Sequence, residues 1–149
     1  MEKETYLNKE VGYKFTTKEV AITDKDLDLI YDFLGPREHF FVHDDYAQSL
    51  ELKYQKRIVA GIFLLLLVVK LDISVGMTFD AILCGMNDIK FISAAYPGDR
   101  LRLDGELLSK KTTSKGHILI EWQWILKNQN DTIIATGKHT ELFPKASIY

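Results

Sequence analysis

The sequence predicts an α+β domain in which an antiparallel sheet wraps around one long apolar helix. Residues 58–69 carry no polar side chain, which is typical of a helix buried in a core. After residue 78 the pattern changes to successive strand-like segments separated by turn residues. The 149 residues match the usual size of one domain, so we expect a single domain over residues 1–149.

Composition and charge exclude several classes of protein. The formal net charge is -2 and no basic patch is present, which argues against a nucleic-acid partner. The apolar run is shorter than the about 20 residues that cross a bilayer, and residues 1–9 do not resemble a secretory signal, so we expect no membrane association. The single cysteine, Cys84, forms no internal disulfide, and we expect it to be a buried small hydrophobe in a cytoplasmic protein.

The first third of the chain predicts a strand followed by a short helix. Loose alternation of polar and apolar residues over residues 11–21 indicates the strand. Thr23 has the pattern of a helix N-cap with acidic residues after it, and Gly35-Pro36 supplies a stop signal. Residues 37–55 are mixed in character, so we expect a loop with a turn or two of helix over residues 44–49.

The rest of the chain predicts the core helix and its sheet. Residues 58–69 are apolar on every side, so we expect a helix that protein surrounds. Trp122 and Trp124 alternate with polar residues and should share one sheet face, as core or dimer contacts. His117 and His139 are expected at the surface or at an interface. Five strands are expected, over residues 79–86, 89–95, 100–109, 117–127 and 132–143.

Three segments carry a resemblance to a known family. They are Phe33-Leu34-Gly35 through Asp45-Tyr46-Ala47, then Arg57-Ile58-Val59-Ala60-Gly61-Ile62, then Tyr96-Pro97-Gly98-Asp99 through Leu103. In order and spacing they resemble the catalytic loop, the start of the central helix and a Pro-Gly-Asp turn of the MaoC-like (R)-specific enoyl-thioester hydratases and 3-hydroxyacyl-thioester dehydratases. The resemblance covers nearly the whole chain, roughly Gly12 to Phe143, and implies the hot-dog fold.

The resemblance also implies a substrate and a binding group. It points to (R)-3-hydroxyacyl or 2-enoyl thioesters of coenzyme A or acyl carrier protein. Gly61 matches the family glycine whose backbone N–H binds the thioester oxygen at the positive end of the helix. Ala60 and His39 are the further candidates for substrate binding. Gly61 has a second interpretation, because a glycine there also permits close packing of the sheet on the helix.

The sequence departs from the family at both catalytic positions. Pro36 stands where the family has Asp, Phe41 stands where it has His, and neither side chain transfers a proton. Glu38 and His43 each lie two positions further on and are the candidate substitutes for this acid–base pair. In a loop so rich in charge, the simpler interpretation is that they are solvated or capping groups.

Three functions remain open on this resemblance. The first is a hydratase or dehydratase that uses Glu38 and His43, and the second is a binding subunit that holds the acyl thioester while a related chain does the chemistry. The third is a hot-dog thioesterase with Glu38 as its water-activating carboxylate. In each case we expect no cofactor, no metal and an apolar tunnel beside the helix. We also expect a homodimer, or a heterodimer with a related hot-dog chain.

Overall fold

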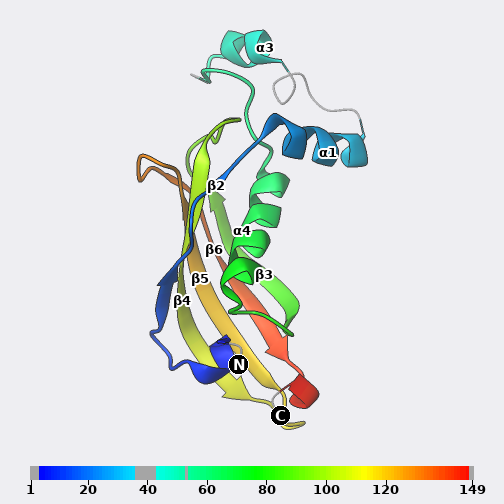
Figure 1. Cartoon of the computed structure of the whole chain (residues 1–149), viewed down its shortest axis with the longest axis vertical. Helices are drawn as coiled ribbons and strands as arrows, with labels where there is room; N and C mark the ends of the chain where they lie inside the picture. The colour runs from blue at the N-terminus through cyan, green and yellow to red at the C-terminus, as the bar shows by residue number, and fades with distance from the viewer. Residues whose placement is uncertain (1–3, 36–42, 53, 148–149) are drawn as a thin grey trace.

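A computed structural model of the chain describes residues 4–35, 43–52 and 54–147. Figure 1 shows a long helix, α4, lying along one face of a sheet, with α1 and α3 beyond its N-terminal end. The helices are α1 (Asp24–Leu34), α3 (Asp44–Ser49) and α4 (Gly61–Val75), with 3-10 turns at Tyr6–Asn8 and Lys145–Ser147. The strands are β1 (Lys14–Thr16), β2 (Val20–Ala21), β3 (Ile82–Phe91), β4 (Arg100–Thr112), β5 (Ile118–Lys127) and β6 (Ile133–Phe143).

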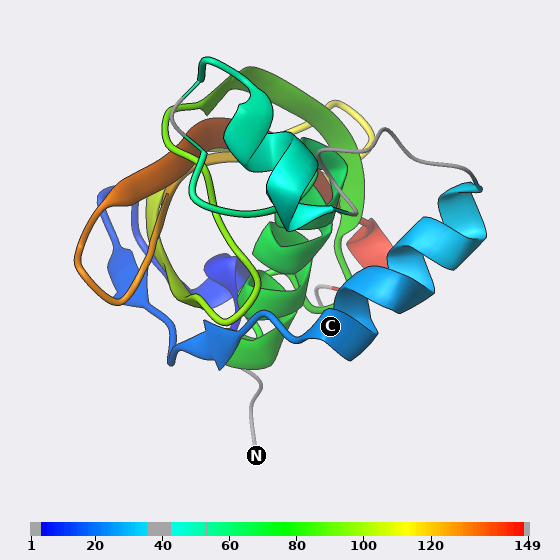
Figure 2. The same ribbon diagram turned by 90° about the horizontal axis from the view of Figure 1, so that it is seen from above.

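The sheet has the order β1-β4-β5-β6-β3, with β2 paired to the start of β4, and every pairing is antiparallel. Burial alternates along β4, β5 and β6, so one face of the sheet packs in the core. Trp122 and Trp124 are buried on that face, as expected of core residues. Seen from above, the sheet curves around α4 (Figure 2). The predicted α+β class is therefore confirmed.

The central helix is displaced from its predicted bounds. It begins at Gly61 rather than residue 58, because Ala60 is extended and the N–H groups of Val59 and Ala60 donate to residues of other segments. Val59 N–H donates to Ala95 O at 2.9 Å. At its other end the helix continues beyond residue 69 to Val75, and Gly76 ends it with a left-handed φ of 78°.

One face of α4 is exposed, although we expected protein on every side. Leu64, Leu67 and Leu71 are among the buried residues of the helix, and they join the main hydrophobic cluster. Ile62 and Leu66 on the opposite face are each 49% exposed. The chain by itself therefore covers α4 on one side only.

The predicted elements of the first third are largely confirmed. Thr23 caps α1 in a capping box with Asp26, Gly35 ends the helix with a φ of 85°, and α3 forms over the expected residues. The expected strand over residues 11–21 is split into β1 and β2. Thr17 interrupts it, because its side-chain Oγ1 accepts the Leu103 N–H at 3.0 Å.

In place of the two strands expected over residues 79–86 and 89–95 there is one strand, β3, which begins at Ile82 and ends at Phe91. Asp88 adopts a left-handed φ of 53°, and the pairing with β6 shifts register between Asn87 and Lys90. The Asn-Asp pair is thus a β-bulge rather than a turn. Strand β3 lies at the sheet edge, and most of its side chains are exposed.

Two side chains lie elsewhere than predicted. Cys84 is exposed on edge strand β3 rather than buried. His139 is fully buried and packs edge-on against Trp122 and Trp124, with ring centroids 5.1 and 5.7 Å away. Within the described ranges, no helix combines the length and the apolar character needed to cross a bilayer.

Candidate functional site

A cavity of about 580 Å³ opens at the N-terminal end of α4, a volume within the range of small-molecule sites. Three stretches of chain form its walls: the segment after α3, the segment leading into α4, and the end of β3 with the residues that follow it. The lining residues are Leu52, Tyr54, Ile58, Val59, Gly61, Leu64, Phe91, Ile92, Ser93, Ala94, Ala95 and Tyr96.

The first turn of α4 presents unpaired amides beside this cavity. The N-cap residue is Ala60, whose methyl side chain accepts no hydrogen bond. The amides of Phe63 and Leu64 donate to Ala60 O, at 3.0 and 3.3 Å. In the part of the chain that the structure describes, the amides of Gly61 and Ile62 have no partner. Together with the helix dipole, they can bind an oxygen that carries partial negative charge.

Gly61 also has the packing role that the sequence left open. A Cβ built on Gly61 would lie 2.8 Å from Cζ of Phe91, so the tip of that ring fills the place of a side chain. Phe91 is the last residue of β3, is 52% exposed and lines the cavity with Gly61. Any larger residue at position 61 must displace this ring.

The described wall of the cavity offers an apolar surface with a few hydroxyl groups. Its side chains are mostly apolar, and its polar side chains are the hydroxyls of Tyr54, Ser93 and Tyr96. Among the described lining residues there is no carboxylate and no imidazole. No group of three or more His, Cys, Asp or Glu in the described ranges is placed to hold a metal ion.

The predicted site residues fall into two groups. Pro36, Glu38, His39 and Phe41 lie outside the described residues. His43 is the exposed N-cap residue of α3 and lines a separate hollow with Asp44, Asp45 and Arg57. The structure therefore does not bring His43 to the cavity beside Gly61.

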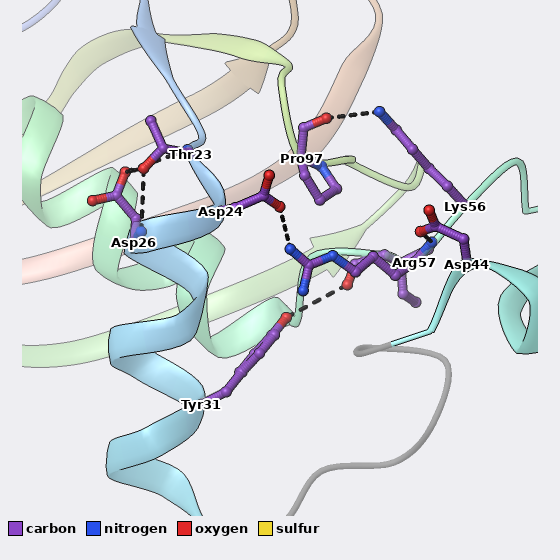
Figure 3. Close-up of polar contacts among 9 residues, drawn as sticks. Thr23, Asp24, Asp26, Tyr31, Asp44, Lys56, Arg57 and Pro97 are labelled. Atoms are coloured by element: carbon purple, nitrogen blue, oxygen red, sulfur yellow. Dashed lines mark hydrogen bonds and ion pairs between the residues drawn. The ribbon is translucent and has the colours of Figure 1, made fainter.

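The segment leading into α4 is fixed by contacts from several elements (Figure 3). Arg57 forms an ion pair with Asp24 at the start of α1, and its backbone N–H donates to Asp44 Oδ1 at 2.8 Å. Lys56 Nζ donates to Pro97 O at 2.8 Å. These contacts fix the position of the cavity wall relative to α1, α3 and the Pro-Gly-Asp turn.

A group of polar side chains is buried near the other end of α4, and we call Tyr6, Asp72, His139 and Glu141 the buried polar cluster. Asp72 and Glu141 are 2% and 6% exposed, and Tyr6 and His139 are fully buried. Among the described residues, the Tyr6 hydroxyl, Asp72 Oδ1 and both His139 ring nitrogens have no hydrogen-bond partner. We did not expect this cluster from the sequence.

Burial shifts the protonation of the buried polar cluster. It raises the pKa of Asp72 to about 7. The hydrogen bond from Thr78 lowers this pKa, and the charge of Glu141 raises it further. Burial raises the pKa of Glu141 to about 7 as well and lowers that of His139 to about 4. His139 Nδ1 lies 4.0 Å from Glu141 Oε1, beyond hydrogen-bond distance, so we treat the pair as neutral rather than ionic.

Comparison with known proteins identifies structural neighbours. No protein-family model and no curated protein sequence matches the chain. A putative MaoC domain protein dehydratase from Chloroflexus aurantiacus is similar at a TM-score of 0.87 and 18% identity, over 97% of this chain and 41% of that one. The (R)-hydratase PhaJ1 from Pseudomonas aeruginosa is similar at a TM-score of 0.75 and 22% identity, over 95% of this chain and 86% of that one.

A third neighbour is a complex of two chains. The HadBC (3R)-hydroxyacyl-ACP dehydratase complex from Mycobacterium tuberculosis matches at a TM-score of 0.75 and 11% identity, over 91% of this chain and 98% of that one. At such identities the likeness establishes the fold. The structural neighbours of this chain are thus MaoC-like dehydratases and (R)-hydratases, and the chain has the hot-dog fold.

Proposed function

We propose that the chain binds an (R)-3-hydroxyacyl or 2-enoyl thioester in the cavity beside Gly61. The observation that carries this proposal is the uncapped first turn of α4, whose Gly61 and Ile62 amides lie beside a largely apolar cavity. A thioester carbonyl would accept these N–H groups while the acyl chain lies on the apolar wall. The hydratases and dehydratases among the structural neighbours support this class of ligand.

Binding without turnover is the role that the described residues favour. The cavity wall they form contains no acid–base pair, and His43 lines another hollow. The chain would then hold the acyl group while a related chain supplies the Asp and His. Hydration by this chain, with Glu38 and His43 as substitutes, is the second candidate, and the retained glycine supports it. A thioesterase reaction through Glu38 has less support, because no further feature favours it.

Titration of the purified chain with crotonyl-coenzyme A tests the proposal. We expect saturable binding by calorimetry and no binding of free coenzyme A, because the acyl thioester supplies the carbonyl and the apolar tail. The absorbance of the enoyl thioester should stay constant with this chain alone. Turnover by the chain alone would establish the second candidate instead, and failure to bind crotonyl and longer enoyl thioesters would contradict the proposed function.

We further propose that the chain pairs with a second hot-dog chain, which is a copy of itself or a related sequence. Strand β3 is an edge strand that leaves Ile82, Leu83 and Met86 partly exposed. The exposed face of α4 adds Ile62 and Leu66. Uncovered apolar edges of this kind invite pairing with another chain. The complex of two chains among the structural neighbours supports such a partner.

Cys84 offers a direct test of pairing, because it is the only cysteine and is exposed on β3. A spin label on Cys84 is expected to show dipolar coupling between two copies, since pairing through β3 brings the labels close together. Mixing with excess unlabelled chain should remove the coupling. A stable monomer in analytical ultracentrifugation, with no coupling at any concentration, would contradict the homodimer and leave a related chain as the partner to test.

A further inference from the structure

Tyr31 links helix α1 to the backbone just before α4. Its side chain is buried, with 7% of the residue exposed. The Tyr31 hydroxyl accepts the Ala60 N–H at 3.3 Å, and it donates to Ile58 O at the longer distance of 3.5 Å. Figure 3 shows the ring reaching from α1 to this segment. One hydroxyl therefore bridges two backbone groups within the last three residues before Gly61.

We propose that Tyr31 is a positioning residue of the thioester site, an inference that rests on the function proposed above. Its hydroxyl holds the Ala60 N–H, which belongs to the peptide next to the one that carries the Gly61 N–H. Holding this peptide fixes the direction in which the first amides of α4 point. Ala60 has no side-chain oxygen that could cap the helix, so its own side chain does not perform this task.

Helix α1, which carries Tyr31, is itself fixed by two further contacts. Helix α1 begins in the capping box of Thr23 and Asp26, and the ion pair between Asp24 and Arg57 joins its first turn to the same segment. Tyr31 lies two turns further along α1. Two separate points of one helix thus hold the backbone before Gly61, which limits how far that backbone can rotate.

The Tyr31→Phe variant tests the inference, with Tyr13→Phe as its matched control. Both variants remove one hydroxyl, and Tyr13 is a half-buried residue that does not line the cavity. We expect Tyr31→Phe to weaken binding of crotonyl-coenzyme A about threefold to tenfold, the loss of roughly one hydrogen bond. The infrared carbonyl stretch of the bound thioester should also move back toward its value in water, because misdirected amides polarise it less.

Hydrogen exchange of the free protein provides a readout that needs no ligand. In the wild type the Ala60 amide should be protected, while the Gly61 and Ile62 amides exchange fast. In Tyr31→Phe the Ala60 amide should lose its protection while the amides of the central sheet keep theirs. Unchanged affinity and carbonyl stretch in a folded Tyr31→Phe would overturn the positioning role. If the wild type binds no thioester, the proposed function fails. Independently of ligand binding, unchanged exchange of the Ala60 amide in Tyr31→Phe would show that the Tyr31 hydroxyl does not hold this amide.

Discussion

The free energy of unfolding is expected to fall as the pH rises from about 5 to about 8, because the folded chain holds protons on Asp72 and Glu141 that the unfolded chain releases. Both carboxyls have a pKa of about 7 when folded, against 3.8 and 4.5 ordinarily. Their stabilising effect is complete below the ordinary values and is lost as the pH passes through 7. One pKa unit corresponds to about 1.4 kcal/mol, so the effect is large for one domain.

His139 has the opposite effect on the free energy of unfolding and partly offsets the two carboxyls below about pH 6.5. Its pKa of about 4 lies below the ordinary 6.5. Between these two values the imidazole is neutral in the folded chain and protonated in the unfolded chain. This contribution is present above the ordinary value and is lost as the pH falls through 4. Two carboxyls outweigh one imidazole between about pH 5 and 6.5, and above that range only the carboxyls act.

Glu141→Gln and Asp72→Asn are the variants that test this dependence. Each keeps an oxygen that can accept the present hydrogen bond, from Trp122 or from Thr78, and removes the ionisation. Chemical denaturation should be used to measure the free energy of unfolding at pH 5 and at pH 8. The difference between these two values should be smaller by about 2 kcal/mol in Glu141→Gln than in the wild type. Asp28→Asn on the exposed face of α1 makes the same acid-to-amide change outside the buried polar cluster and should leave the slope as it is in the wild type. A wild-type stability that rises between pH 5 and 8 would contradict the assignment.

The buried polar cluster shows where interpretation of the sequence was limited. The period of β6 places His139 and Glu141 on the same face as buried Phe143, so strand alternation alone could have indicated that they point inward. We instead expected His139 at the surface or at an interface, because it lies in a strand far in sequence from the catalytic loop. Asp72 gave no such signal, since it lies beyond the apolar run that we took to be the whole helix.

The candidate site was predictable only in part. The resemblance of residues 57–62 to the start of the family's central helix pointed to Gly61 before the fold was known, because it is a local pattern. The contacts of Gly61 are between segments far apart in sequence. Phe91 reaches it from the end of β3, and Tyr31 reaches its neighbour Ala60 from α1. No local pattern encodes contacts of this kind, and a side chain at the end of an exposed edge strand gives no sign of them.

The role of the Gly61 amide can be separated from its packing role by two double variants. Phe91→Ala in both removes the ring that a new Cβ would strike. Gly61→Ala in this background keeps the N–H, whereas Gly61→Pro removes it. Proline suits this position, because Gly61 is the first residue of the helix and the preceding Ala60 has φ -63° and ψ 141°. The Gly61 N–H has no partner among the described residues, so no internal hydrogen bond there is lost.

We expect the proline double variant to bind crotonyl-coenzyme A about tenfold more weakly than the alanine double variant, since it lacks one hydrogen bond to the carbonyl. If a partner chain restores turnover, the difference in rate should be larger, on the order of 100-fold, because charge on that oxygen increases in the transition state. Circular dichroism and thermal unfolding should show that both variants fold alike. Equal affinity in two folded variants would mean that the glycine serves packing against Phe91 alone and that the thioester carbonyl is held elsewhere.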